Sequence, residues 1–402
     1  MNVEKIVRSG LCSGCGLCAG ILDDGKIKME MSPDGFLRPV ETADITRVEQ
    51  DAIEATCPGI TLAHETASDV PYNPDWGPII TSRAGFSNDP EIRRLASSGG
   101  ALSGILHYLL ESGSVDFVVH VGMSKSTPFR NELFESRTRE EIIERAGSRY
   151  SPAAPLMKIR QALQSPGRFA VVGKPCDIAG LRNYLRQNPT LNDRIPALVS
   201  FFCAGVPSEA GTLDLLRELG VTSGDLASFK YRGDGWPGFA TATSHDGTVR
   251  RMDYDTSWGT ILNRHLQFRC KICPDGTGEF ADIVCADGWH MDKEGNPDFS
   301  EREGRSVILT RTKNGENIVQ AAMSGDYIRT EPLDLNLLPA MQPFQKRRKQ
   351  LALSRLAALV VLLRPTPRFR GLRLWRAALK GGVTANLRSF LGTFVRITGI
   401  RR

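Results

Sequence analysis

The sequence has 402 residues, of which 41% are hydrophobic and 24% charged, as in ordinary globular proteins, and this length predicts two or three domains. No apolar run reaches the roughly 18–20 residues that a membrane-spanning helix needs. Residues 1–10 are polar and lack the apolar core of a signal peptide, so we expect a cytoplasmic protein. The nine cysteines are then expected to bind metal or to serve redox chemistry, because the cytosol keeps thiols reduced.

The net charge of +6 is unevenly distributed. Residues 346–402 hold 15 of the 51 Lys and Arg residues and no Asp or Glu, which leaves 36 basic against 45 acidic residues in the rest of the chain. The sequence therefore combines an acidic body with a basic tail.

Residues 1–65 contain four cysteines in a pattern typical of iron–sulfur proteins. Cys12, Cys15 and Cys18 are each separated by two residues, and Cys57 precedes a proline. Three thiolates at this spacing can bind three corners of a [4Fe–4S] cluster, and a remote Cys-Pro can supply the fourth ligand. Zinc sites more often pair two Cys-x2–4-Cys units. We therefore predict a small ferredoxin-like module, residues 1–65, in which these four cysteines hold one [4Fe–4S] cluster.

A linker and then an α/β domain are predicted to follow. Three prolines within residues 69–78 disfavour regular structure, so residues 66–78 are taken as the linker. Beyond it, short apolar strands alternate with helical stretches, which predicts a largely parallel sheet packed with helices over residues 79–340. The class is α/β, or α+β for the whole chain. The strands are predicted at 115–121, 169–172 and 198–202, and the helices at 101–111, 140–146 and 177–186.

Five further cysteines lie in the α/β region. Cys176 and Cys203 each follow a predicted strand, at the sheet edge where ligands bind in open α/β folds. The Cys-x-x-Cys pair of Cys270 and Cys273 can close a tetrathiolate site with them, although such a pair equally suits zinc or a redox dithiol. Lone cysteines are also common core residues. Cys285 lies in an alternating segment and is predicted to be an inert thiol on a buried strand.

Several motifs occur in order in the body of the chain. They are Ser97-Ser98-Gly99-Gly100, Gly147-Ser148-Arg149-Tyr150, Gly173-Lys174-Pro175-Cys176, Cys203 to Ser208, Cys270-x-x-Cys273 and Ala281-Asp282-Ile283. Taken together, over roughly residues 8–330, the sequence resembles the family of coenzyme F420 hydrogenase/dehydrogenase beta subunits. The resemblance implies FAD bound in an α/β domain, [4Fe–4S] clusters and electron transfer between two-electron and one-electron partners. It assigns Cys176, Cys203, Cys270 and Cys273 to a second [4Fe–4S] cluster.

The resemblance also gives a set of expected FAD contacts. Residues 97–100 precede a predicted helix, whose N–H groups and dipole suit a pyrophosphate; the alternative is a plain serine cap with a packing glycine. Arg149 or Lys174 can place positive charge near the flavin, or be an ordinary surface charge. The loop 231–238 can contact an acidic substrate or cover the flavin, or form a glycine-rich hairpin with a packed Trp. The expected contacts are Ser97, Ser98, Gly99, Gly100, Ser148, Arg149, Tyr150 and Lys174.

The predicted function is electron transfer between coenzyme F420, or another organic substrate, and one-electron carriers such as ferredoxin. This chemistry is supplied by the cofactors, so no catalytic acid, base or nucleophile is assigned. Three alternatives remain. They are a non-catalytic electron-transfer subunit of a larger complex, a ferredoxin-dependent reductase of an organic substrate, and a zinc-stabilised binding protein.

Residues 341–402 form a tail outside the resemblance. Four consecutive basic residues, 346–349, precede an apolar stretch at 351–363, and two amphipathic segments follow around Trp375 and Phe390. Basic amphipathic helices can lie on an anionic membrane, so peripheral contact with the inner membrane surface is one interpretation. Docking on the acidic body or on a partner subunit is another, and attachment to nucleic acid is the least favoured.

Overall fold

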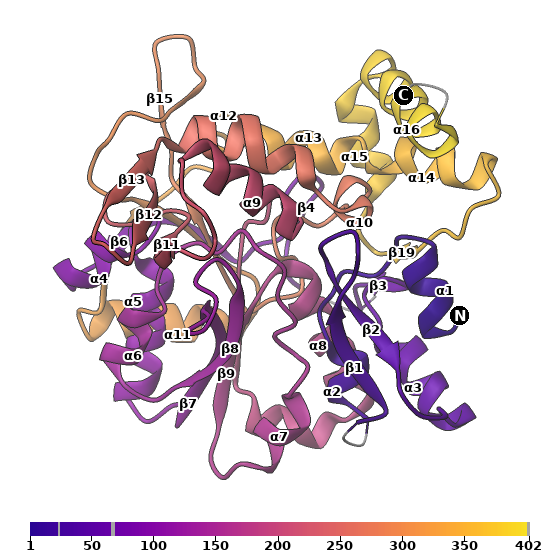
Figure 1. Ribbon diagram of the computed structural model, residues 1–402, viewed down its shortest axis with the longest axis horizontal. Helices are drawn as coiled ribbons and strands as arrows, with labels where there is room; N and C mark the ends of the chain where they lie inside the picture. The colour runs from indigo at the N-terminus through magenta and orange to yellow at the C-terminus, as the bar shows by residue number, and fades with distance from the viewer. Residues whose placement is uncertain (23–24, 66–68, 400–402) are drawn as a thin grey trace.

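The computed structural model describes residues 1–22, 25–65 and 69–399 (Figure 1). Its centre is an eight-stranded sheet with the strand order β18-β6-β17-β14-β10-β9-β7-β8. These strands are β6 (Thr81–Ser87), β7 (Phe117–Met123), β8 (Asn131–Ser136), β9 (Phe169–Gly173), β10 (Ala197–Phe201), β14 (Ile283–Asp287), β17 (Ser306–Thr310) and β18 (Ile328–Pro332).

Only the middle of this sheet is parallel. The pairs β14–β10, β10–β9 and β9–β7 are parallel, whereas β14–β17, β17–β6, β6–β18 and β7–β8 are antiparallel. The mixed α/β class agrees with the sequence, but the prediction of a largely parallel sheet is wrong. Parallel neighbours need a crossover connection, usually a helix. No helix separates β7 from β8 or β14 from β17, so these strands pair antiparallel.

Helices cover both faces of the sheet. On one face, α5 (Ala101–Glu111) and α11 (Lys313–Ser324) pack on alternate residues of the central strands, such as Val118. On the other face, α7 (Ile159–Gln164) and α8 (Pro175–Gln187) pack on the residues between, such as Val119. This alternation follows from the two-residue period of a strand. The predicted helices and strands are therefore confirmed to within a few residues.

Smaller elements surround the sheet. A three-stranded antiparallel sheet, β11-β12-β13, packs with α9 into a separate hydrophobic cluster. The remaining elements of this region are α4 (Pro90–Leu95), α6 (Arg139–Glu144), η1 (Pro189–Arg194), α9 (Glu209–Glu218), β11 (Leu226–Lys230), β12 (Ala240–Ser244), β13 (Val249–Met252), η2 (Asp255–Ile261), η3 (Leu262–His265), α10 (Phe268–Lys271), β15 (His290–Met291) and β16 (Pro297–Asp298).

The N-terminal residues fold into short helices around one hairpin. Strands β1 and β2 pair antiparallel, and α3 begins with a capping box between Thr46 and Glu49. In its described part, residues 69–78, the predicted linker carries only the two-residue strands β4 and β5. Residues 23–24, 66–68 and 400–402 of the predicted module, linker and tail lie outside the described residues. The elements are α1 (Val3–Arg8), α2 (Leu17–Gly20), β1 (Ile27–Met31), β2 (Leu37–Glu41), α3 (Arg47–Thr56), β3 (Thr61–Ala63), β4 (Tyr72–Asn73) and β5 (Gly77–Pro78).

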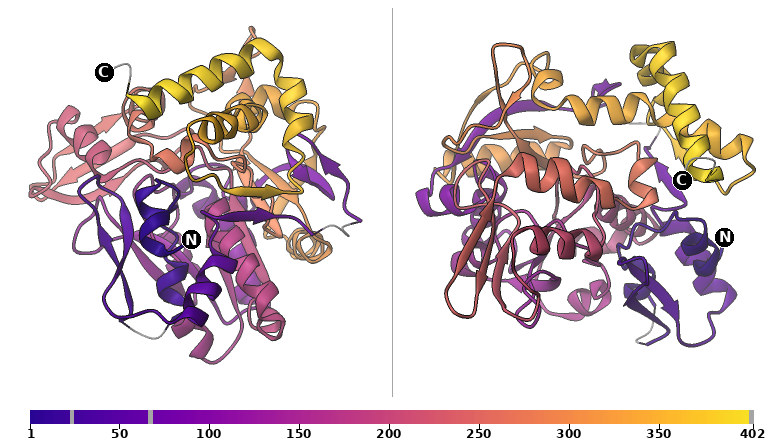
Figure 2. Two further views of the ribbon diagram at one scale, coloured as in Figure 1. Left: turned by 90° about the vertical axis from the view of Figure 1, so that its right-hand side faces the viewer. Right: turned by 45° about the horizontal axis from the view of Figure 1, so that its top comes forward.

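The basic tail is helical and docks on the body of the protein. Its strand β19 pairs in parallel with β3, and apolar residues of α14 pack in one cluster with Ile6 and Leu62 of the N-terminal part. Figure 2 shows α14 to α16 together at one edge of the molecule. In the described part of the chain, no helix combines the length and apolar character of a membrane span. The tail elements are α12 (Leu338–Met341), α13 (Pro343–Gln350), α14 (Ala352–Val361), β19 (Arg368–Arg370), α15 (Leu374–Gly381) and α16 (Val383–Thr398).

Candidate functional site

The first four cysteines line one small cavity of about 30 Å³. Cys12 and Cys15 lie in the loop between α1 and α2, Cys18 lies in α2, and Cys57 caps the C-terminus of α3. Gly14 has a φ of +74°, which a residue with a side chain rarely adopts, and its N–H lies 3.4 Å from Cys12 Sγ. The loop thus turns tightly enough for all four thiols to reach the same cavity.

The electrostatics of these thiols fit an iron–sulfur cluster. Burial raises the pKa of all four, that of Cys57 to about 11. For Cys15, Cys18 and Cys57, neighbouring cysteines of the set raise the pKa further. Four adjacent buried thiolates therefore need positive charge between them. Among the described residues, no group of three or more His, Cys, Asp or Glu side chains is close enough to hold a metal ion, so the support for a cluster here is the cysteine spacing and the shared cavity. A [4Fe–4S] core, which spaces four thiolates around a larger group, suits this donor set.

The second four cysteines gather at the carboxyl edge of the parallel strands. β9 and β10 are neighbours, so Cys176 in the first turn of α8 and Cys203 after β10 lie at the same edge. Cys270 lies in α10, and its Sγ accepts a hydrogen bond from Val206 N at 3.4 Å, which joins α10 to the Cys203 loop. Burial raises the pKa of Cys203 to about 12, and Cys270 and Cys273 act in the same direction. Burial also raises the pKa of Cys176, and Cys203 and Cys270 in turn act on it in the same direction, so the four thiols are within electrostatic reach of one another.

A larger cavity of about 280 Å³ adjoins this second set, near the lower end of small-molecule site volumes. Cys203 and Cys285 both line it. Cys285 lies on the buried strand β14, as predicted, and burial alone raises its pKa to about 12. The wall also contains all of the expected FAD contacts except Gly99, namely Ser97, Ser98, Gly100, Ser148, Arg149, Tyr150 and Lys174.

The N-terminus of α5 faces the larger cavity. Its cap is Gly100, at a φ of +71° and without a side-chain hydrogen bond, so the alternative of a serine cap is wrong. Ser97 Oγ instead accepts a hydrogen bond from the N–H of Ser148, and Ser98 Oγ donates to Arg305 O at 2.9 Å. Gly99 packs closely against the backbone of β6, since a Cβ at position 99 would lie only 2.7 Å from Gly85 O. This position therefore has no room for a side chain. Gly100, Ala101, Leu102 and Ser103 at this helix start all line the cavity, and the first N–H groups of a helix have no intrahelical partner.

Both predicted cations in the cavity wall are held by protein groups. Arg149 donates to Asn131 Oδ1 at 2.9 Å and to three backbone oxygens, of residues 128, 130 and 229. Lys174 Nζ lies 2.8 Å from both carboxylate oxygens of Asp177. Burial acts to lower the pKa of Lys174, but Asp177 outweighs it and the pKa is raised. Lys174 therefore stays charged beside the second cysteine set.

Arg232 forms a third cationic position in the wall, within the loop 231–238. Its buried guanidinium makes a bidentate ion pair with Asp287, with both distances 2.9 Å. Trp236 also donates to Asp287, at 2.8 Å, and stacks on Trp289 with ring centroids 4.7 Å apart. The guanidinium lies 4.6 Å from the ring centroid of Tyr254. This corner is thus a fixed charge enclosed by aromatic rings.

Two family models match the chain. The model described as coenzyme F420 hydrogenase/dehydrogenase, beta subunit N-term, matches residues 83–160, and the corresponding C-terminus model matches residues 167–336. The chain belongs to the family of coenzyme F420 hydrogenase/dehydrogenase beta subunits. Within this family match lie the large sheet, except the first two residues of β6, the second cysteine set and every expected FAD contact. Residues 1–82, with the first cysteine set, and residues 337–402 lie outside both models, so the predicted resemblance from residue 8 extends further than the models do.

Individual relatives agree with this assignment. The coenzyme F420 hydrogenase subunit beta of Methanothermobacter thermautotrophicus is 27% identical over 298 residues, or 72% of this chain and 97% of that protein. The coenzyme F420-dependent sulfite reductase of Methanocaldococcus jannaschii is 22% identical over 353 residues, which cover 83% of this chain and 49% of that protein. A chain of the F420-reducing [NiFe] hydrogenase complex from Methanosarcina barkeri matches with a TM-score of 0.58 at 20% identity, over 73% of this chain and 96% of that chain. This last likeness shows a shared fold.

The tail, outside the family models, also contributes to the larger cavity. Gln342 and Gln345 both line it. Gln342 Nε2 donates to Asp287 O at 2.8 Å, whereas the buried Oε1 of Gln345 has no hydrogen-bond partner. Sequence reasoning missed both residues, because nothing in the tail sequence indicates that α13 returns to the sheet edge.

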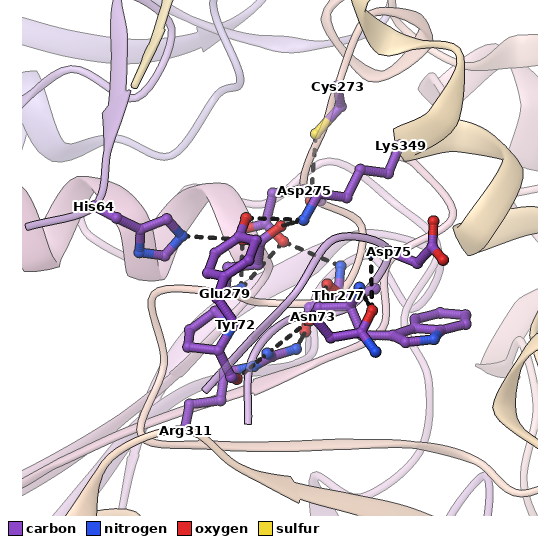
Figure 3. Close-up of polar contacts among 12 residues, drawn as sticks. His64, Tyr72, Asn73, Asp75, Cys273, Asp275, Thr277, Glu279, Arg311 and Lys349 are labelled. Carbon is purple, nitrogen blue, oxygen red and sulfur yellow. Dashed lines mark hydrogen bonds and ion pairs between the residues drawn. The ribbon is translucent and has the colours of Figure 1, made fainter. Parts of the chain in front are cut away.

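A buried polar network connects the tail to the loop after Cys273 (Figure 3). Glu279, whose side chain is 0% exposed, accepts hydrogen bonds from Lys349 Nζ at 2.5 Å, Tyr72 OH at 2.7 Å and His64 Nε2 at 3.0 Å. Burial acts to raise the pKa of Glu279, but Lys349 and His64 hold it well below its usual range. Arg311 closes the network by donating to backbone oxygens, including Thr277 O at 2.6 Å. One carboxylate thus joins the N-terminal part, the linker, the Cys273 loop and the tail.

Proposed function

We propose that this chain is an iron–sulfur flavoprotein oxidoreductase that moves electrons between a two-electron donor or acceptor and one-electron carriers. The observation that carries the proposal is the larger cavity, whose wall runs from the expected FAD contacts at Ser97 and Ser98 to Cys203 of the second cysteine set. FAD, when bound, exchanges electron pairs with organic substrates and single electrons with clusters.

The residues around the cavity have distinct roles in this proposal. The backbone N–H groups at the start of α5 bind the pyrophosphate, since they are free donors at the positive end of the helix dipole. Lys174, held charged by Asp177, stabilises negative charge on the bound cofactor. Arg232 orients an anionic part of the cofactor or substrate, and Tyr254 and Trp289 exclude water around it.

The two cysteine sets are proposed to hold one [4Fe–4S] cluster each. Cys176, Cys203, Cys270 and Cys273 hold the inner cluster, because Cys203 lines the larger cavity. Cys12, Cys15, Cys18 and Cys57 hold the outer cluster, in a ferredoxin-like module of residues 1–65. Residues 79–340 are then the FAD-binding domain, residues 66–78 the linker, and residues 341–402 an added tail.

Anaerobic purification followed by iron, sulfide and flavin analysis tests the proposal. The expected result is about eight iron atoms and one FAD per chain. Zinc in place of iron, with no flavin, would refute it and support a zinc-stabilised binding protein.

Coenzyme F420 is the proposed two-electron partner, on the strength of the relatives' names. Single-turnover mixing with reduced F420, reduced ferredoxin and NAD(P)H, each alone, identifies the donor by bleaching of the flavin absorbance. Bleaching by ferredoxin but not by F420 would instead favour a ferredoxin-dependent reductase.

A second candidate is an electron-transfer subunit of a larger complex. Two relatives carry the name coenzyme F420 hydrogenase subunit beta, one in Methanothermobacter thermautotrophicus and one in Methanosarcina barkeri. A chain that accepts electrons from F420 but passes them to no small acceptor without a partner protein would support this candidate.

For the tail, we propose peripheral contact with an anionic membrane surface. Apolar side chains recur every fourth residue from α15 into α16 and are exposed, among them Leu379 (73%), Val383 (85%) and Leu387 (57%), and Arg376 and Arg388 are exposed beside them. Exposed apolar groups next to cations match the interface of an anionic bilayer. The full chain should co-sediment with vesicles containing phosphatidylserine, and Leu387→Glu should abolish this. Equal binding of both proteins would refute the proposal.

A further inference from the structure

Arg269 is a buried arginine that lies next to both cysteine sets. It occupies α10, directly before Cys270, and only 2% of the residue is exposed. Its Nη2 donates to Pro58 O at 3.1 Å, and Pro58 directly follows Cys57 of the first set. The guanidinium carbon lies 5.4 Å from the ring centroid of Phe369 in β19. The side chain therefore bridges the segment that carries one set and the segment that carries the other.

The position of Arg269 brings its charge beside both cysteine sets. Its side chain donates to the residue that follows Cys57, and its backbone directly precedes Cys270. One guanidinium therefore lies beside both proposed cluster sites. Figure 1 is consistent with this position, because α10 lies between the N-terminal residues and the tail helices.

The hydrogen-bond donors of Arg269 are not all used by the protein. Its Nε and Nη1 are buried and have no hydrogen-bond partner, and within the described residues Arg269 forms no ion pair. Two other large buried cations have a counter-ion: Arg232 pairs with Asp287, and Lys349 pairs with Glu279. Arg311 has no ion pair within the described residues either, but it donates to three backbone oxygens and leaves only its Nε without a partner. A buried cation with orphaned donors is costly unless an anionic acceptor compensates for it.

Two tetrathiolate sites supply such an acceptor. Four thiolates around a [4Fe–4S] core leave a net negative charge, and hydrogen bonds to the sulfurs help to set the reduction potential. The orphaned N–H groups of Arg269 and its missing counter-ion are both accounted for if clusters occupy the neighbouring sites.

We propose that Arg269 is a positioning residue that joins the two cluster sites, donating N–H groups toward their sulfurs and raising the reduction potential of both clusters. The inference rests on the proposed function. Its physical basis is that one added electron makes each cluster more negative, and a nearby fixed cation stabilises that reduced state more than the oxidised one.

Redox titration of the full-length, anaerobically purified protein, followed by electron paramagnetic resonance, tests this inference. In Arg269→Met, the signals of both clusters should shift to more negative midpoint potentials at unchanged iron and sulfide content. Arg269→Lys should shift both in the same direction by less, because an ammonium keeps the charge but lacks the planar fork of donors. Arg264→Met is the matched control, since Arg264 lies in η3, five residues earlier, and is exposed.

The outcomes separate this inference from the proposed function. A wild-type protein without iron would refute the proposed function itself. If the wild type contains both clusters but Arg269→Met, Arg269→Lys and the control all keep the wild-type midpoint potentials, only the role of Arg269 is overturned. A shift in the potential of only one cluster would overturn it as well. If Arg269→Met does not fold, Arg269→Lys decides: wild-type potentials in both clusters would overturn the inference.

Discussion

The ion pair between Lys349 and Glu279 gives a stringent test of how the tail is attached. The two side chains are 2% and 0% exposed, with Nζ and Oε1 2.5 Å apart. Replacing Lys349 with Met keeps the volume but leaves the carboxylate, within the described ranges, with Tyr72 and His64 as its remaining side-chain donors. Removing one partner of a buried pair typically costs about 3–5 kcal/mol. We expect Lys349→Met to lower the free energy of unfolding by this amount.

Urea unfolding at pH 7, followed by tryptophan fluorescence, measures the loss. The double variant Lys349→Met with Glu279→Gln should recover more than half of it, because no uncompensated charge remains in the interior. Lys346→Met is the control in the same helix; within the described part of the chain Lys346 forms no ion pair, so its replacement should cost less than about 0.5 kcal/mol. A loss below about 1 kcal/mol for Lys349→Met, or no recovery in the double variant, would refute the reasoning.

Three further results are expected. Burial opposes ionisation of Glu316, but the hydrogen bond from Arg83 outweighs it and the pKa of Glu316 is lowered to about 2. The ionised carboxylate therefore stabilises the folded state by about 1–2 kcal/mol after allowance for solvent screening. This stabilisation is present above pH 4.5 and is lost as the pH falls toward 2. Urea unfolding at several pH values should show Glu316→Gln converging on the wild type at low pH, and a constant difference would contradict this. Asp287→Asn should reduce the flavin-to-protein ratio several-fold, because Arg232 loses the bidentate carboxylate that holds its guanidinium in place, whereas Asp298→Asn, at the partly exposed ion pair with Arg302, should not. Cys203→Ala should remove about four iron atoms per chain and Cys285→Ala none; equal iron loss would contradict the ligand assignment.

The local pattern of the sequence was sufficient for the individual elements of the central fold. The apolar period over residues 101–111 predicted α5 with its observed bounds, and the strands followed by Cys176 and Cys203 were located to within one or two residues. These features depend on neighbours a few positions away, so a single sequence reveals them. The same holds for the spacing of Cys12, Cys15 and Cys18, because a short loop places them by itself.

Strand partners and buried charge partners were decided only by tertiary structure. The antiparallel positions of β6, β17 and β18 arise from pairing between segments more than 200 residues apart, for which the sequence contains no local cue. Likewise, the partner of Glu279 lies 70 positions away, in a tail for which docking on the body was only one of the interpretations, and the sequence shows Arg269 only as the neighbour of a cysteine. Charge pairing and orphaned donors depend on which surfaces pack together. The cysteine motifs thus indicated the chemistry from sequence alone, while the fold determined which residues surround it.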